Sequence, residues 1–141
     1  MKNRNKKCFI VLFILSIIAI LMVIYKIKEK QTTELIFENA VIDIPEDTPD
    51  ADQAVHILEK TLVNQMPECR ITKLYVDDRS PLIQTYEKKG EEVLLLQMDF
   101  YIVETSGADP LIPYQQYEGY TWTFTRKDAD NKWSLISWGY F

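Results

Sequence analysis

The chain has little of the chemistry that thiol and metal sites require. Its 141 residues include two cysteines and one histidine. Cys8 lies at the edge of an apolar run near the N-terminus and Cys69 lies far along the chain, so we expect no disulfide framework. With His56 as the one histidine, a structural zinc site is excluded, and we expect neither a metal nor a cofactor.

Acidic residues are scarce in the first part of the chain, and basic residues are outnumbered in the second. Residues 1–30 carry seven Lys or Arg and one acidic residue, whereas residues 31–141 carry nine Lys or Arg and twenty acidic residues. The two parts therefore have net charges of +6 and -11. A domain as acidic as the second part is repelled by nucleic acid and by anionic lipid surfaces. We expect no nucleic-acid partner.

Charge is absent altogether from residues 8–25, which read CFIVLFILSIIAILMVIY. As a helix this run is roughly 27 Å long at 1.5 Å per residue, close to the hydrocarbon thickness of a bilayer. Lysines flank the run on both sides, and Tyr25 stands where an interfacial aromatic residue is expected. Residues 8–25 therefore predict one transmembrane helix, with the membrane as its partner.

Three other interpretations of this run fit less well. A cleaved signal peptide needs small residues after the apolar stretch, and YKIKEKQTTE offers none. A lipoprotein would carry its cysteine at the C-terminal end of the run, but Cys8 is at the other end. Uniform hydrophobicity argues against a buried core helix of a water-soluble protein. We therefore expect an uncleaved signal-anchor.

The distribution of positive charge predicts the orientation of this anchor. Four basic residues precede the run and three follow it, which favours a cytoplasmic N-terminus. We expect a single-pass protein of the cell membrane with its C-terminal domain outside. Its parts would be residues 1–30 (cytoplasmic basic tail and anchor), 31–47 (stalk and first strand) and 48–141 (one globular domain).

One helix is predicted after the anchor. Residues 35–44 are rich in β-branched residues and predict a strand. Thr48 then serves as N-cap, with Pro49 at the first helical position, and the helix runs to about Gln65. Its apolar face is formed by Ala51, Ala54, Val55, Leu58 and Leu62.

The remainder of the chain is predicted to form strands over residues 71–76, 82–86, 91–104, 120–125 and 133–140. In the longest of these, alternate residues from Leu94 to Ile102 are apolar and should share one face. The fold class is therefore α+β, with one helix packed on a curved, mainly antiparallel sheet.

The closing hairpin, TWTFTRKDADNKWSLISWGY, carries a resemblance to known domains. It resembles the C-terminal end of cystatin-like or nuclear-transport-factor-like cone domains, and the similarity covers about residues 48–141. The resemblance implies a cone-like fold. Such domains, membrane-tethered or lipid-anchored and of unknown function, are common on the outer face of Gram-positive bacteria. The enzymes among cone domains usually have two or three helices before the sheet, where this sequence predicts one.

Asp99, with Gln97 and Tyr101, is the best catalytic candidate. The three alternate onto the second face of the longest predicted strand. A carboxylate beside a tyrosine hydroxyl could act as a base and an oxyanion donor. The alternative is a half-solvated strand face of ordinary polar residues. The turn over residues 128–132 departs from the calcium-loop pattern, and we interpret His56 as a surface residue of its helix.

The connection over residues 106–119 is the best candidate for recognition. It holds Pro110 and Pro113 followed by Tyr114 and Tyr117, and Tyr120 follows in the next strand. Tyrosines on such a loop suit a protein or peptide partner, although they also pack a long loop onto its own sheet. Our hypothesis is a membrane-tethered extracytoplasmic interaction or accessory module. The alternative is a small cone-type enzyme of proton-transfer or isomerase type that uses Asp99 and Tyr101.

Overall fold

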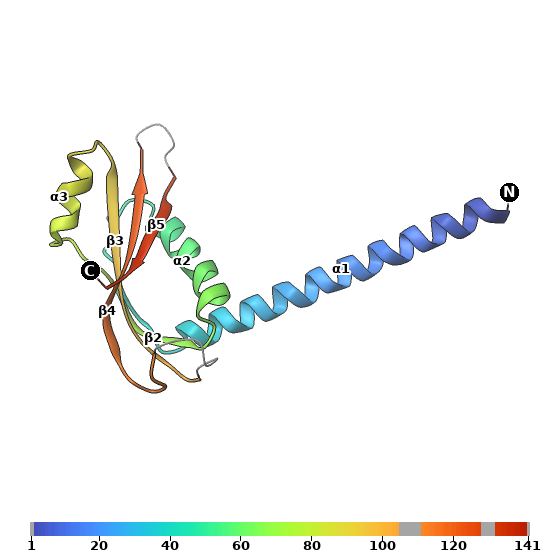
Figure 1. Ribbon diagram of the computed structural model, residues 1–141, viewed down its shortest axis with the longest axis horizontal. Helices are drawn as coiled ribbons and strands as arrows, with labels where there is room; N and C mark the ends of the chain where they lie inside the picture. Colours follow the sequence, from blue (N-terminus) through green and yellow to red (C-terminus); the bar gives the residue numbers. More distant parts are fainter. Residues whose placement is uncertain (1, 105–110, 128–131, 141) are drawn as a thin grey trace. The chain divides into compact units, whose positions relative to one another are not determined.

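The computed structural model of the chain describes residues 2–104, 111–127 and 132–140, with the backbone alone for residues 2–9 (Figure 1). The chain divides into two compact units, Met1–Thr32 and Thr33–Phe141. Within the second unit two helices pack on a sheet of five strands that stays open. The predicted α+β class is therefore confirmed.

Helix α1 spans Lys2–Phe37 and includes the whole apolar run predicted as an anchor. The part from Ile10 onward is long and apolar enough to cross a membrane. The helix continues further than the sequence predicted, because residues 35–37 are helical and the first strand, β1, is confined to Val41–Asp43. Ile36 in this last turn is buried in the core of the second unit, which stabilises the helical conformation there.

The sheet follows the order of the chain, β1-β2-β3-β4-β5. Strands β2 (Cys69–Val76), β3 (Glu92–Ile102), β4 (Tyr117–Arg126) and β5 (Ser134–Gly139) pair antiparallel with their neighbours. Strand β1 pairs parallel with β2, which makes the sheet mixed. Both β1 and β5 are edge strands.

Helix α2 spans Ala51–Gln65 and buries Ala54, Leu58 and Leu62, as its apolar face predicted. Its start differs from the prediction, because the N-cap is Asp50 rather than Thr48. Thr48 instead belongs to a tight turn in which its N–H donates to the carbonyl of Pro45. Asp50 takes up the left-handed conformation, which an aspartate tolerates better than most residues.

A second helix, α3, spans Pro81–Glu87, where the sequence predicted a strand over residues 82–86. Ser80 is its N-cap and accepts a hydrogen bond from the N–H of Leu82 at 3.3 Å, while Pro81 takes the first helical position. This prediction was wrong because the run is too short for its apolar pattern to separate helix from strand. Figure 1 shows α2 and α3 on opposite faces of the sheet.

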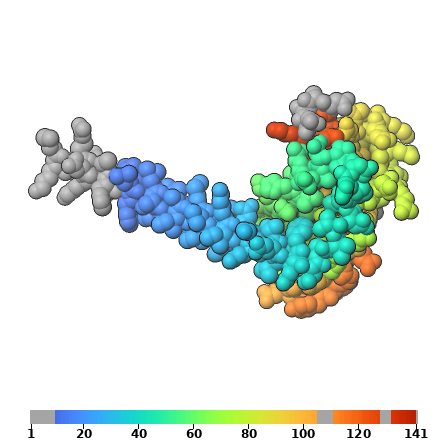
Figure 2. Space-filling view, turned by 180° about the vertical axis from the view of Figure 1, so that it is seen from behind, coloured from blue at the N-terminus to red at the C-terminus, as the bar shows by residue number. Residues whose placement is uncertain are grey.

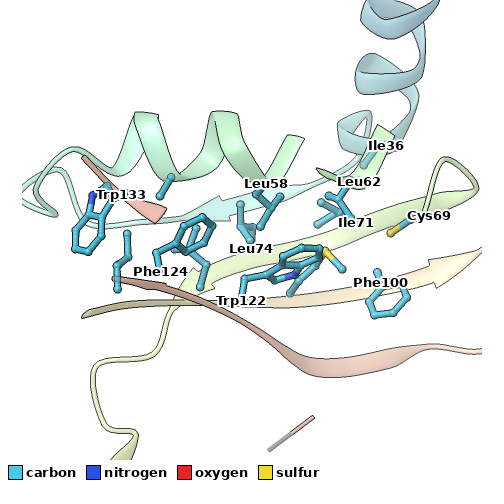
Figure 3. Packing of buried hydrophobic residues seen from close by; sticks show 14 of the residues in the cluster. Ile36, Leu58, Leu62, Cys69, Ile71, Leu74, Phe100, Trp122, Phe124 and Trp133 are labelled. Atoms are coloured by element: carbon cyan, nitrogen blue, oxygen red, sulfur yellow. The ribbon is translucent and has the colours of Figure 1, made fainter. Parts of the chain in front are cut away.

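The main core lies between α2 and the sheet (Figure 3). Leu58 and Leu62 pack over Leu74, and the large rings of Trp122 and Phe124 fill the space below. Viewed from behind, the segment from β1 through α2, cyan to green, forms most of the visible surface of the second unit (Figure 2). This face of the sheet is therefore closed to solvent over most of its width.

One charged side chain ties the start of α2 to the sheet. Arg126, at the end of β4, pairs with the carboxylates of Asp50 and Glu92, and its guanidinium lies 4.5 Å from the ring centroid of Trp133. The N–H of Trp133 donates to the side chain of Gln53. The Arg126 side chain is only 10% exposed, whereas the Asp50 and Glu92 side chains are 52% and 51% exposed, so the contacts are shielded from water on the side of the guanidinium alone.

We predict that Arg126→Met lowers the free energy of unfolding by about 2 kcal/mol, because charge-assisted hydrogen bonds and a cation–π contact are lost together. The measurement is urea unfolding of the full chain in detergent, followed by tryptophan fluorescence. Lys127→Met, one residue along at an exposed position, is the control and should change little. Equal effects of the two substitutions would contradict the role given to Arg126.

Candidate functional site

The polar strip predicted on the second face of β3 exists. Gln97, Asp99 and Tyr101 are half-buried and alternate with the buried residues of the core face. Oδ1 of Asp99 accepts a hydrogen bond from the N–H of Gly119 at 2.8 Å and one from the hydroxyl of Tyr75 at 3.5 Å. Among the hydrogen bonds of the described residues, those of Asp99 involve Tyr75 and Gly119 rather than Tyr101.

The bond to Gly119 has a structural role. The pairing of β3 with β4 shifts between Met98 and Phe100, which leaves an extra residue on β4 opposite Asp99. Gly119 occupies this bulge with a φ of 69°, a conformation that glycine adopts freely. Because a bulge interrupts the ladder, the N–H of Gly119 needs another acceptor, and the carboxylate of Asp99 provides it.

Gln97 joins a second polar contact on the same face. Its Nε2 donates to Oδ2 of Asp77 at 3.0 Å and to the hydroxyl of Thr121 at 3.5 Å. Sequence reasoning missed both Asp77 and Tyr75. The only signal for Tyr75 was its alternation along β2, and its position near Asp99 depends on the strand register, which the sequence does not reveal.

The electrostatics of Tyr75 favour its neutral form. Burial raises the pKa of its hydroxyl, and the neighbouring carboxylate of Asp99 raises that pKa further. The hydroxyl therefore keeps its proton near neutral pH and acts as a donor to Asp99. A tyrosine with a raised pKa is a weak general acid at that pH, so the pair acts chiefly as a hydrogen bond.

The described part of the predicted recognition loop, residues 111–116, presents Tyr114 to solvent. Its side chain is 74% exposed and its backbone has a φ of 61°, unusual for a bulky residue. The N–H of Tyr114 donates to the carbonyl of Ile102 at 2.7 Å. This bond joins the loop to the end of β3 while the ring points away from the core.

Tyr117 lies in strand β4 rather than in the loop, and it supports the loop from below. Its ring stacks on that of Phe100 with centroids 5.3 Å apart, and its hydroxyl accepts the N–H of Ile112 at 2.7 Å. Gln116 adds a side-chain bond to the hydroxyl of Thr72 at 2.9 Å. Of the two loop tyrosines predicted for recognition, Tyr114 is exposed and Tyr117 is half-buried.

Tyr120 belongs to a third surface, which we call the aromatic edge and define as Tyr120, Trp138 and Tyr140. Tyr120 meets Tyr140 edge-on at 5.2 Å, and Trp138 stacks on the buried Trp122 at 5.7 Å. Trp138 and Tyr140 are 45% and 56% exposed. Sequence reasoning used these two residues only for a family resemblance, although their alternation already placed them on one face.

Two further candidates were the histidine of α2 and the turn before β5. His56 is exposed on α2, with its Nδ1 3.5 Å from Glu59, and the turn over residues 128–131 falls outside the described residues. Within the described part of the chain, no three His, Cys, Asp or Glu side chains are grouped so as to hold a metal ion. Cys69 is fully buried, and burial raises the pKa of its thiol to about 12.

Protein-family models, curated proteins and solved structures were compared with the chain, and none matches it. The polar strip, the tyrosine loop and the aromatic edge are therefore the features from which a function has to be inferred.

We predict that Asp99→Ala destabilises the domain by about 1–3 kcal/mol, because the N–H of Gly119 loses its acceptor. Asp99→Asn keeps a carbonyl oxygen in the same place, so it should lose less than half as much. Thermal unfolding of the full chain in detergent measures both. If Asp99→Asn were as destabilising as Asp99→Ala, the charge rather than the hydrogen bond to the bulge would be what matters.

Proposed function

We propose that the protein is a membrane-tethered module whose domain faces the outside of the cell and recognises a protein or peptide partner through Tyr114. The observation that supports this most directly is the exposure of a large aromatic ring on a backbone held in the left-handed region. Such a conformation in a non-glycine residue costs about 1–3 kcal/mol and is found chiefly where function requires it.

Residues 111–116 are suited to recognition because they are held in place before any partner arrives. Hydrogen bonds from Tyr114, Ile112 and Gln116 hold them to β3, β4 and β2 respectively. A partner therefore has little loop entropy to remove on binding, and burial of the ring contributes most of the affinity.

The tether is supported by composition. Residues 8–25 are apolar throughout, and the net charges of +6 and -11 separate the part that would contact lipid headgroups from the part that would avoid them. A cystatin-like or cone-like character of the domain, on the outside of a bacterial cell, is part of the proposal. The packing of α2 across an open sheet supports it.

The enzyme alternative has less support in the geometry. Oδ1 of Asp99 accepts from both Gly119 and Tyr75, so a base would have to act through Oδ2. Tyr101, which the alternative needs beside Asp99, is not among the partners of Asp99 in the described hydrogen bonds.

We predict that the domain is labelled from outside the cell. Cys69 is unsuitable as a probe because it is buried and its thiol keeps its proton. The variant therefore carries Asp78→Cys, at a side chain that is 83% exposed, together with Cys8→Ser. A membrane-impermeant maleimide added to intact cells should modify this variant fully. Cys8→Ser alone is the control and should stay unmodified until the protein is denatured. Modification of the Asp78→Cys variant only after lysis would place the domain inside.

We predict that removing the ring of Tyr114 weakens partner binding roughly tenfold or more, as for a central aromatic anchor. The full chain is purified in detergent and used to capture proteins from cell envelopes. Tyr114→Gly is the sharpest variant, because glycine removes the ring and also relieves the backbone strain. Tyr114→Phe keeps the ring and is the matched control.

Tyr117 is avoided in this experiment, because its loss would also remove the stacking on Phe100 and the support of the loop. Identical sets of captured proteins for wild type and Tyr114→Gly would show that Tyr114 is not the recognition residue.

A further inference from the structure

The outer edge of β5 is an open pairing surface. Among the described residues β5 pairs only with β4, so the backbone groups along its other side have no strand beside them. The sequence from Trp133 to Phe141, WSLISWGYF, contains no charge and no proline. Exposed along this strand and just beyond it are Ile136, Trp138 and Tyr140.

The opposite edge of the sheet shows how this protein protects an edge. Strand β1 has only three residues, and its Asp43 forms an ion pair with Lys73 at 3.4 Å. Short length, charge and bulges are among the means by which proteins prevent an edge from pairing. Strand β5 is twice as long as β1 and carries no charge, and a bulge at Ile136 interrupts its pairing with β4, so its edge is the less protected of the two.

The two ends of the β5 edge carry opposite charge. Near its start lies the exposed Lys132, beside a hollow of about 630 Å³. Lys127 and Arg126 also line this hollow, but they form ion pairs within the domain, Lys127 with Glu91 and Arg126 with Asp50 and Glu92.

At the other end of β5, Gly139 pairs with Thr121 of β4. Strand β4 extends beyond this pair, and the exposed Glu118 lies in the extension. At this end burial raises the pKa of Tyr140, and Tyr117 and then Asp99 raise it further.

We propose that the β5 edge pairs antiparallel with the β5 edge of a second copy of this chain, joining two sheets across a two-fold axis. In that arrangement the start of each β5 lies beside the end of its partner, so Lys132 of one copy approaches Glu118 of the other. A parallel arrangement would place like charges together.

In the paired arrangement, side chains of the second copy cover the aromatic edge. Trp138 and Tyr140 lie on the same face as their β4 neighbours Trp122 and Tyr120, and an added strand places apolar side chains beside them. The inference rests on the proposed function in one respect. Two copies tethered in one membrane meet at a raised effective concentration, so a modest interface suffices.

The test uses the full chain in detergent micelles, with the dimer dissociation constant measured by sedimentation. We expect a dimer whose dissociation constant rises roughly tenfold or more in Trp138→Lys, which places a charge in the pairing surface. Val41→Lys puts the same charge on the exposed β1 edge and is the matched control, expected to leave the dimer unchanged. Unchanged thermal unfolding of both variants establishes that they remain folded.

Charge reversal tests the antiparallel arrangement. Lys132→Glu and Glu118→Lys should each weaken the dimer several-fold, and the double variant should restore it, because the interacting pair is reversed. A monomeric wild type would overturn the proposal. A dimer that persists in Trp138→Lys would also overturn it and would indicate association through the anchor. The proposal would also be overturned if the wild type were monomeric and a different protein co-purified with it but not with Trp138→Lys. That result would show that a strand of another protein pairs with this edge.

Failure of this inference is separable from failure of the proposed function. A monomer that is still labelled from outside through Asp78→Cys and still captures partners through Tyr114 would refute only the dimer. A dimer broken by Trp138→Lys in a protein labelled only after lysis would refute the topology and leave the pairing intact.

Discussion

Strand β3 has to bury side chains on both of its faces, and most of the domain follows from that constraint. Its core face carries five apolar residues that pack under α2, with Phe100 at the end near the loop. On the other face, Leu95 is only 1% exposed and lies outside the main core cluster. A residue buried there needs its own cover, and α3 on that side of the sheet supplies it (Figure 1).

The short length of α3 determines where the second face becomes polar. Beside Leu95 the face is covered, and three threonines of β4 are buried there. Further along β3, past the covered part, the residues change to Gln97, Asp99 and Tyr101, which hydrogen-bond or reach solvent. The arrangement that made Asp99 look catalytic in sequence is therefore also what a partly covered strand requires, since polar groups belong where the cover ends.

The parts of the fold that local periodicity controls were predictable. The stripe of α2 and the alternation of β3 follow from the spacing of apolar residues alone. The strand predicted over residues 82–86 was wrong, although Ser80-Pro81 is a capping signal of the same kind as Thr48-Pro49. At Thr48-Pro49 that signal was applied two residues too early, because the N-cap is Asp50. The partners of Asp99 were out of reach, because Gly119 lies twenty residues away and meets it only through a bulge in the register.

The two edges of the sheet differ in charge and in aromatic content. Trp138 and Tyr140 pack on Trp122 and Tyr120 and leave the β5 edge without charge, whereas the ion pair of Asp43 protects the edge at β1. An open apolar edge is a liability for a folded domain, because it can pair with other chains. Self-pairing turns that liability into an interface of limited extent, because a two-fold contact uses up both edges, while β1 prevents the sheet from extending further.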